Sequence, residues 1–397
     1  MKKKFRALGV ISGVGSMLIG AKQAGFDIVG NIEWRPYYHT GTFEHNFKKA
    51  FLVKNIKDLP RKQIKDLKNI DLIMGHPECG GFSNLNIHKE NLNKDPMDIP
   101  LFADLVKRIQ PRFFVMDNLP GSLLIFKMKD WVKRFPNYDL YPEWISNYHY
   151  GNLQKHRKRF FMIGSLKSEN FVFQPNEKEN TTTVEDALGD IFNKYDGEVK
   201  NHYEHVTEAD CGKALGLLEV NVRSTWEDLR DHFKGQKCGH NMMYFAKDGT
   251  IKGRYALIKT YWEKHCHVLT GDNPTVHPLT NLPFSIRERA RLQGCPDDFE
   301  FIGEKIDSDN KWDHQLNKIF VKQTGKFMPV QFCNYVSKQI MAHIENKKFS
   351  CSGERFISPH IYIDESKKWY CDNIGYKNQR RVCDSCWLNC MCKNFPQ

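Results

Sequence analysis

The first 164 residues alternate short apolar runs with stretches in which apolar residues recur at helical spacing. We interpret five of these runs as strands, at residues 7–12, 27–33, 71–75, 111–118 and 159–165. Residues 16–26 and 36–47 read as helices. Strands that alternate with helices predict an α/β fold, with a mostly parallel sheet covered by helices on both faces. Ligands in that architecture bind at the carboxyl ends of the strands.

The alternation is lost between residues 165 and 277, a segment rich in Lys, His, Asn and aromatic residues. We expect a second, smaller domain with short strands there. Helical spacing returns in residues 285–299, which Ser285 can cap, and in residues 329–344. The sequence therefore predicts a first domain over 1–164, a small domain over 165–277, the remainder of the first domain over 278–348 and a tail over 349–397.

Composition and charge narrow the class of protein. With 397 residues, of which 40% are hydrophobic, the chain is long enough to bury a core in more than one lobe. Lys and Arg outnumber Asp and Glu by 59 to 47, a net charge of +12, which favours polyanions through counterion release. Nucleic acid is therefore the first partner to consider. A solvated, mildly basic surface explains the charge equally well.

The amino-terminal stretch MKKKFRALGVISGVGSML places basic residues before apolar ones, as a secretion signal does. Glycines interrupt the apolar part and the alternating pattern continues beyond it, so we interpret it as a first buried strand and its turn. No run of eighteen apolar residues occurs anywhere, so we expect no membrane span and a cytoplasmic protein.

The twelve cysteines are unevenly distributed, because six of them lie in residues 351–397. We expect reduced thiols and a metal site in the tail before a disulfide framework. The close pair in CDSC has the spacing of two zinc ligands. The candidate ligands are Cys371, Cys383, Cys386 and either Cys390 or Cys392. A reduced, partly disordered basic tail is the alternative.

The turn SGVGS follows the first predicted strand and opens a helix, where bare backbone can approach a ligand closely. Glu33 ends the second predicted strand, where a carboxylate can accept hydrogen bonds from ribose hydroxyls. Since the full GxGxxG spacing is absent, the pair indicates a single adenosine rather than a dinucleotide. An ordinary tight turn is the alternative.

Three further stretches carry polar groups at the same predicted edge of the sheet. Cys79 follows the strand DLIMG in a glycine-rich loop, as a nucleophile would, although a lone cysteine is more often a small buried hydrophobe. Asp117 and Asn118 end another strand, where a carboxylate can bind a ring nitrogen or simply form a turn. The basic stretch LQKHRKRFFMIG suits phosphate contacts or a solvated loop.

Seven stretches, in order along the chain, resemble the DNA cytosine-5 methyltransferase family. They are ISGVGSMLIGAKQAGFDIVGNIEW, GHPECGGFS, MDNLPG, QKHRKRFFMIG, VEDALGD, HPLTNLPFSIRERARLQGCPDDFEF and QTGKFMP. The first three resemble the family's cofactor-binding opening, its nucleophile loop and its Glu-Asn-Val element. The fourth and fifth resemble its Gln-x-Arg-x-Arg element and the stretch just after that element. The last two resemble the helix after the recognition domain and the closing Gln-x-Gly-Asn-x-x-Pro loop. The tail beyond residue 349 lies outside the resemblance.

The resemblance implies a Rossmann-like S-adenosylmethionine-dependent domain, with residues 165–277 as a target recognition domain. It implies methylation of cytosine in double-stranded DNA by a monomer, with the target base flipped out of the duplex. The thiolate of Cys79 would add to C6 and activate C5, Asp117 would hold and protonate N3, and Asn118 would support the loop. Arg157 and Arg159 would bind near the target nucleotide or the nucleophile loop. The cofactor contacts implied are Ser12, Gly13, Gly15, Glu33, Trp34, Asn55, Pro77, Gly325 and Lys326.

Four positions depart from the family pattern. Glu78 replaces a proline beside Cys79, so its charge must point away or be paired with a cation such as Lys89, Arg157 or Lys326. Asp117 replaces a glutamate and is one methylene shorter. The basic element has one extra residue. If the element is aligned from the strand FFMIG, which we prefer, Lys155 stands for the family's glutamine and Arg157 and Arg159 stand for its arginines. If it is aligned from Tyr150-Gly151, Gln154 keeps its place, but His156 and Lys158 stand for the arginines.

Lys326 stands where the family has an asparagine near the amino-acid end of the cofactor. An added cation favours a cofactor with an extra carboxylate, carboxy-S-adenosylmethionine, which would give 5-carboxymethylcytosine. Pairing with the ordinary methionine carboxylate, or a position in solvent, are the alternatives. Two other functions are open: an inactive relative that only binds DNA, and a methyltransferase acting on tRNA.

Overall fold

The computed structural model describes much of residues 4–349, with gaps that include residues 79–97, 203–233 and 243–256, and two short strands beyond residue 349. The described residues are 4–35, 38–54, 67–78, 98–119, 128–155, 157–194, 199–202, 234–239, 241–242, 257–269, 275–281, 284–303, 312–349, 361–363 and 369–371.

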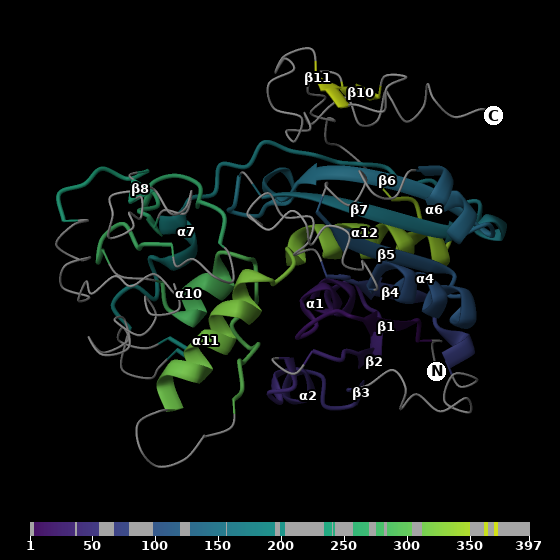
Figure 1. The fold of residues 1–397 in the computed structure, drawn as a ribbon, viewed down its shortest axis with the longest axis horizontal. Coiled ribbons are helices and arrows are strands. Elements are labelled where there is room, and N and C mark those ends of the chain that lie inside the picture. The colour runs from purple at the N-terminus through teal and green to yellow at the C-terminus, as the bar shows by residue number, and fades with distance from the viewer. Residues whose placement is uncertain are drawn as a thin grey trace, which may run out of the picture.

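A seven-stranded sheet forms the centre of the larger lobe, in the order β3-β2-β1-β4-β5-β7-β6 (Figure 1). Its strands are β1 (Arg6–Val10), β2 (Asp27–Ile32), β3 (Phe51–Val53), β4 (Leu72–Gly75), β5 (Phe113–Asn118), β6 (Tyr138–Ser146) and β7 (Lys158–Leu166). The strands from β1 to β5 are parallel, whereas β7 runs antiparallel to β5 and β6. The predicted α/β class and mostly parallel sheet are confirmed, while β3 and β6 were not expected.

The helices are α1 (Ser16–Gln23), α2 (Thr42–Asn46), α4 (Asp98–Ile109), α6 (Met128–Arg134), α7 (Val184–Leu188), α10 (Ile286–Arg291), α11 (Trp312–Gly325) and α12 (Val330–Ile344). Short 3-10 turns span Leu67–Asn69, Asn147–Tyr150 and Lys167–Glu169, and two small hairpins pair β8 (Asn241–Met242) with β9 (Leu257–Ile258) and β10 (Ile361–Ile363) with β11 (Trp369–Cys371). The helix predicted over 36–47 is shorter, because α2 begins after Gly41 at φ 86°. The helix predicted over 285–299 ends at Arg291, ahead of Gly294 at φ 80°.

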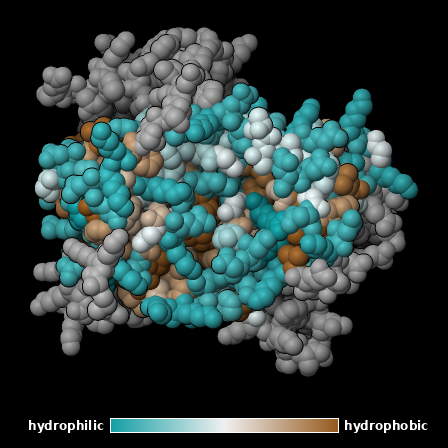
Figure 2. All heavy atoms as spheres, turned by 180° about the vertical axis from the view of Figure 1, so that it is seen from behind, coloured by the Kyte–Doolittle hydropathy of each residue, from teal (hydrophilic) through white to brown (hydrophobic). Residues whose placement is uncertain are grey.

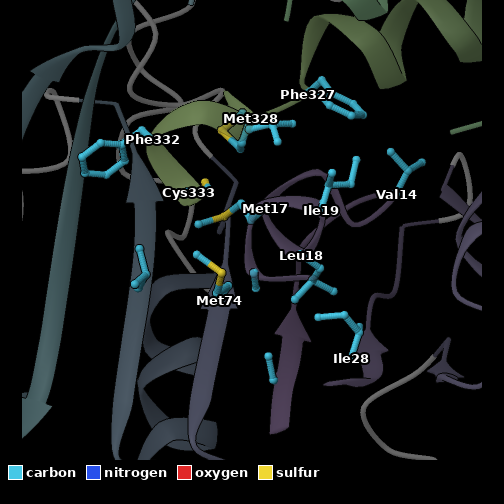
Figure 3. Close-up of a cluster of buried hydrophobic side chains, with 14 of the residues drawn as sticks. Val14, Met17, Leu18, Ile19, Ile28, Met74, Phe327, Met328, Phe332 and Cys333 are labelled. Carbon is cyan, nitrogen blue, oxygen red and sulfur yellow. The ribbon is translucent and has the colours of Figure 1, made fainter. Parts of the chain in front are cut away.

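Successive residues of each strand point to opposite faces of the sheet, and each face has its own core. Ala7, Leu72 and Phe113 pack with α1 and α12 on one face. Their neighbours on the same strands, such as Leu8 and Ile73, pack with α4 and α6 on the other. Figure 3 shows the first core, where residues at the start of α12 face α1 and Met74 of β4. Both faces are covered by helices, as the sequence predicted.

Helix α10 joins this lobe to a second one, which also carries α7 and α11 (Figure 1). Ile286 and Ala290 of α10 belong to the core under α1 and α12, whereas Leu292 directly after it packs with Val184 and Leu188 of α7. Seen from behind, the described surface is mainly hydrophilic, with hydrophobic residues visible between the lobes (Figure 2). Among the described residues, every helix falls short of the length and apolarity that a membrane crossing requires.

Candidate active site

The carboxyl ends of β4 and β5 bring together the central polar residues. Gly75 of β4 pairs with Met116 of β5, so the next residues, His76 and Asp117, lie beside each other. Arg159 of β7 reaches the same place from the antiparallel neighbour of β5. Asp117 is fully buried, and the other two side chains are almost so.

Asp117 accepts two hydrogen bonds from Arg159 and lies within hydrogen-bonding distance of His76. Arg159 donates through Nε to Oδ1 at 2.9 Å and through Nη2 to Oδ2, and His76 Nδ1 lies 2.7 Å from Oδ2. Burial by itself would raise the pKa of Asp117, but the charge of Arg159 and the contact with His76 outweigh it and hold the pKa below its ordinary value. The carboxylate is therefore ionised and fixed in orientation.

Asn118 ties the start of the loop that carries Cys79 to strand β5. Its Nδ2 donates to the carbonyl of Pro77 at 3.2 Å, and its Oδ1 accepts from the backbone of Leu119 at 2.7 Å. The side chain is fully buried. The supporting role expected for Asn118 stays a prediction. Cys79 itself, two residues beyond Pro77, lies outside the described residues.

Glu78, the unexpected charge beside Cys79, is paired. Lys326 Nζ lies 3.2 Å from Glu78 Oε2, and Arg35 Nε lies 3.3 Å from the same oxygen. Arg35 also pairs with Asp98, whose Oδ2 accepts the backbone N–H of Glu78 at 2.9 Å. Two cations thus meet two carboxylates at about one-third exposure or less. Of the three cations considered from the sequence, Lys326 is a partner of Glu78; Lys89 lies outside the described residues.

The glycine turn and Glu33 are joined by hydrogen bonds at the end of β1 and β2. The backbone N–H of Gly13 donates to Glu33 Oε2 at 3.0 Å and that of Arg35 donates to Oε1 at 2.9 Å. Ser12 Oγ donates to Asn31 Oδ1 at 3.0 Å. Burial raises the pKa of Glu33 above its ordinary value, against these hydrogen bonds and the charge of Arg35.

The turn needs glycine for two reasons. Gly13 and Gly15 have φ values of 62° and 90°, in the left-handed region that side chains rarely adopt. A Cβ on Gly13 would meet the ring of Tyr38 at 3.0 Å, and one on Gly15 would meet Phe47 at 2.7 Å. The chain's own aromatic rings therefore occupy the space beside this turn.

The remaining cofactor candidates that the structure describes lie beside β2 and at the end of α11. Trp34 follows Glu33, packs against the core beside β2 and lies under the guanidinium of Arg35, 5.9 Å from the ring centroid. Gly325 ends α11, and its carbonyl accepts from Arg157 at 3.2 Å. Asn55 lies outside the described residues.

Arg157 contacts the closing loop, residues 323–329, and two glutamine side chains. Its Nη2 donates to the carbonyl of Phe327 at 2.8 Å, and its Nη1 donates to Gln293 Oε1 at 2.7 Å and to Gln154 at 3.3 Å. Gln154 is fully buried, whereas Lys155, the residue preferred from the sequence for the family's glutamine, is exposed. The inward position therefore belongs to Gln154, and the extra residue is accommodated between it and Arg157.

Three of the described cysteines differ from what a nucleophile needs. Cys266, Cys295 and Cys333 are buried, and burial raises the pKa of each thiol, to about 12 for Cys266. Such thiols stay protonated near neutral pH and do not act as nucleophiles.

The cysteine-rich tail lies mostly outside the described residues. Of the candidate zinc ligands, Cys371 ends β11, while Cys383, Cys386, Cys390 and Cys392 are not described. In the part of the chain that is described, no cluster of three or more His, Cys, Asp or Glu side chains is arranged to hold a metal ion.

Three residues of the site escaped the sequence analysis. His76 stands between Gly75 and Pro77 in the stretch that drew attention to Cys79, and its position directly after a strand could have indicated it. Arg35 and Asp98 carry no such signal, since Asp98 begins a helix 20 residues after Glu78. Only the folded chain brings these charges together.

The chain matches known proteins over most of its length. The family model of C-5 cytosine-specific DNA methylases matches residues 5–342. Type II methyltransferase M.DdeI of Desulfomicrobium norvegicum is 25% identical over 387 residues, covering 85% of this chain and 89% of that protein. Type II methyltransferase M.XorII of Xanthomonas oryzae is 27% identical over 391 residues, covering 86% of each.

Solved structures share the fold. A prophage-encoded protein of E. coli aligns with a TM-score of 0.58 at 22% identity, covering 86% of this chain and 99% of that one. Spodoptera frugiperda DNMT2 aligns with a TM-score of 0.52 at 12% identity, covering 85% and 99%. Both confirm the Rossmann-like methyltransferase arrangement expected from the sequence.

Proposed function

We propose, from the premise that this chain belongs to the family of C-5 cytosine-specific DNA methylases, that it methylates cytosine in double-stranded DNA through a covalent adduct between Cys79 and C6 of the base. The family's activity supplies the reaction, DNA cytosine methylation. The proposal concerns the residues that carry it out and the form of the DNA.

One observation supports these assignments most directly. Asn118 donates to the carbonyl of Pro77, two residues before Cys79, and the adjacent Asp117 is held by Arg159. A nucleophile loop and a carboxylate for a ring nitrogen are thereby fastened to the same strand end. A thiol that adds to C6 and a group that binds N3 need that proximity, because the two atoms belong to one ring.

The donor set fits the cofactor that the family uses, S-adenosylmethionine. Glu33 presents a carboxylate at the end of β2, oriented by the N–H groups of Gly13 and Arg35, and each of its oxygens has a further lone pair for a ribose hydroxyl. We assign Ser12, Gly13, Gly15, Glu33 and Trp34 to the nucleoside end, with Asn55, Pro77, Gly325 and Lys326 completing the site. When bound, the cofactor supplies a methyl group activated by its sulfonium.

The chain's residues activate the base. Cytosine C5 is a poor nucleophile, so the Cys79 thiolate adds to C6 and makes an enamine whose C5 can take the methyl group. Asp117 binds N3, Arg159 orients Asp117, and Asn118 holds the loop. A base then removes the C5 proton and Cys79 leaves. Arg157 supports this arrangement from a distance, by holding the carbonyls of Gly325 and Phe327.

The DNA has to be opened for this chemistry, since the target base is stacked in a duplex. We assign residues 165–277 to target recognition and residues 1–164 with 278–348 to catalysis. The net charge of +12 favours the phosphate backbone. We propose a monomer that acts where its DNA substrate is, in the cytoplasm of a bacterial or phage-infected cell.

Covalent trapping tests the proposal. A long duplex copied with 5-fluorocytosine in place of cytosine contains the target whatever its sequence, and fluorine at C5 blocks the release of Cys79. With S-adenosylmethionine present, we expect an adduct that survives denaturing electrophoresis and disappears in Cys79→Ser. DNA binding without any adduct would instead identify an inactive DNA-binding relative, and an adduct formed only with 5-fluorocytosine-substituted tRNA would identify an RNA enzyme.

The donor group is a separate question, because Lys326 also fits the carboxylated cofactor considered from the sequence. Its ion pair with Glu78 gives Lys326 a partner within the chain and supports the ordinary methyl donor. DNA treated with S-adenosylmethionine should contain 5-methylcytosine, and DNA treated with carboxy-S-adenosylmethionine alone should contain no modified cytosine. Finding 5-carboxymethylcytosine in wild type but not in Lys326→Asn would support the carboxylated donor instead.

For the tail we propose a structural zinc ion held by Cys371, Cys383, Cys386 and Cys390 or Cys392. The close Cys383 and Cys386 pair supports it. The purified full-length chain should contain one equivalent of zinc by elemental analysis, and Cys383→Ser with Cys386→Ser should lose it. Wild-type protein without zinc would leave the tail as a reduced basic segment.

A further inference from the structure

His76 makes a contact that the proposed reaction has not yet used. Its backbone N–H donates to the carbonyl of Ile11 at 3.0 Å, which continues the pairing of β4 beyond Gly75 and fixes the residue in place. Its ring Nδ1 lies 2.7 Å from Asp117 Oδ2 and 3.1 Å from Arg159 Nη2. Only 8% of the side chain is exposed.

These distances constrain where protons sit. A guanidinium only donates hydrogen bonds, and an ionised carboxylate only accepts them. A contact of 2.7 Å between Nδ1 and Oδ2 therefore needs one proton between the two atoms. Nδ1 cannot both accept from Arg159 Nη2 and donate to Asp117 Oδ2, and Arg159 already donates to both oxygens of Asp117. The shorter contact, 2.7 Å, therefore places the proton on Nδ1 of His76.

Asp117 alone is a poor source of the proton that the reaction requires. Electron density moves onto N3 as the thiolate adds to C6, so N3 must gain a proton as the adduct forms. The pKa of Asp117 is held below its ordinary value, which leaves the carboxylate without a proton near neutral pH. Imidazolium is the ordinary protein group that can hold a proton and release it in this pH range.

We propose that His76 supplies this proton through Asp117, acting as a positioning and proton-storing residue for the N3 partner. The inference rests on the function proposed above. As the bond between the Cys79 sulfur and C6 forms, the Nδ1–H bond of the imidazolium breaks, Oδ2 takes the proton and passes it to N3, and neutral imidazole is left. When Cys79 leaves C6, the N3 proton returns by the same route, so His76 ends each turnover as it began.

Charged side chains from two strands contact His76. They are Asp117 of β5 and Arg159 of β7. Cys333 of α12 lies close enough to Asp117 for the carboxylate to add to the effect of burial in raising the pKa of its thiol. Glu78 follows two residues along the chain and is paired with Lys326 and Arg35.

The pH dependence of adduct formation tests the proposal. The rate of trapping on the 5-fluorocytosine duplex is measured in single turnover between pH 5.5 and 9. Wild type should show a bell-shaped profile, rising as Cys79 ionises and falling as His76 loses its proton. In His76→Asn, which keeps an N–H beside Asp117 but stores no proton, we expect a rate roughly 100-fold lower at pH 7 and no alkaline fall. Duplex affinity and melting temperature should stay at wild-type values.

His149→Asn is the matched control, because this histidine is partly exposed and contacts the carbonyl of Lys178 at 3.2 Å. Its profile should coincide with that of wild type. A wild-type rate that does not fall up to pH 9 would overturn the proposal without any variant, as would a His76→Asn profile that matches wild type. Absence of an adduct in wild type would instead count against the proposed function itself.

Discussion

At the scale of single residues, Glu78 places a negative charge next to the proposed nucleophile. A neighbouring carboxylate raises the pKa of a thiol, which would reduce the thiolate that the reaction needs. Lys326 and Arg35 both contact Glu78 and offset that charge. The two departures from the family pattern, at 78 and 326, therefore compensate each other.

Removing Lys326 should make Cys79 harder to ionise. Lys326→Met leaves Glu78 with less positive charge nearby, and a pair this exposed contributes about 0.5–1 kcal/mol. The uncompensated charge of Glu78 then disfavours the Cys79 thiolate, so alkylation should set in at a higher pH than in wild type. The measurement is the rate of iodoacetamide alkylation at Cys79 against pH, with the site identified by peptide mass spectrometry.

Adding Glu78→Gln to Lys326→Met should return the alkylation profile to that of wild type or shift it to lower pH, because the uncompensated charge is gone. Lys338→Met, an exposed position on α12, serves as the control for losing a lysine. A Lys326→Met profile that coincides with wild type would show that the ion pair does not influence the thiol.

At the scale of elements, α10 begins with a buried capping box. Ser285 Oγ accepts from the N–H of Glu288, and Glu288 Oε2 accepts from the N–H of Ser285 at 2.7 Å. Burial raises the pKa of Glu288 to about 7, partly offset by its hydrogen bonds to Ser285. His277 lies against the same carboxyl, 3.8 Å away, and both side chains are fully buried.

This raised pKa predicts a pH-dependent stability. The folded state holds the Glu288 proton more tightly than the unfolded state, so its stabilisation is complete below about pH 4.5 and lost as the pH rises towards 7. Glu288→Gln keeps the capping contacts and removes the titration. Relative to Glu288→Gln, wild type should lose about 3 kcal/mol in free energy of unfolding between pH 4.5 and 8, measured by urea denaturation.

The matched control is Asp186→Asn, an exposed side chain at the same capping-box position of α7. The hydrogen bonds from Thr183 lower the pKa of Asp186, so its contribution is present above the ordinary pKa and is lost only in acid. The difference between this variant and wild type should therefore be constant from pH 5 to 8. A Glu288→Gln difference that is equally constant would contradict the prediction.

The close approach of α1 and α12 gives a second prediction at this scale. A Cβ on Gly20 would meet the backbone N of Asn334 at 2.5 Å, so Gly20→Ala must push the two helices apart. We expect a loss of about 1–3 kcal/mol in free energy of unfolding. Because α12 follows the closing loop directly, affinity for S-adenosylmethionine should fall as well. Calorimetry measures both the free energy of unfolding and the affinity for S-adenosylmethionine. The control is Gln23→Ala, at an exposed position of α1. Unchanged stability in Gly20→Ala would mean that the two helices can separate freely.

The elements show what the sequence could predict. Strands β1, β2, β4, β5 and β7 stand out because they are buried on both faces and read as apolar runs. Strand β6 contains Asp139, Pro142 and Glu143, so its apolar pattern is broken although it pairs along its whole length with β7. Its pairing is set by contact with a distant segment, which a local pattern does not contain.

Some residues of the site could likewise be predicted from the sequence, and others could not. Asp117 and Asn118 could be predicted because each follows a recognisable strand, and the edge of a parallel sheet collects such residues. The partners of Glu78 could not be identified, since Arg35 and Lys326 come from chain positions far apart on both sides. Several Lys and Arg side chains carry the same charge, so only the three-dimensional structure shows which of them pair with Glu78.

At the scale of the whole molecule, the excess of positive charge should appear in DNA binding. Proteins that neutralise six to ten phosphates lose roughly 10³–10⁵ in affinity between 50 and 200 mM salt. With a net charge of +12, we expect a loss of this order, measured by fluorescence anisotropy with a labelled duplex. Affinity for S-adenosylmethionine over the same range is the control and should change little. A DNA affinity independent of salt would mean that the charge is only a solvated surface.

The packing of α12 on α1 also governs how the protein is made. Met17, Leu18 and Ile19 of α1 are buried against a core that includes Val330, Phe332 and Cys333, more than 300 positions later. At 5–20 residues per second, a ribosome needs about 15–60 s to make the intervening chain. During that interval the apolar side of α1 has no α12 to cover it. The core on this face of the sheet is therefore complete only after its last residues, near the end of α12, have been made.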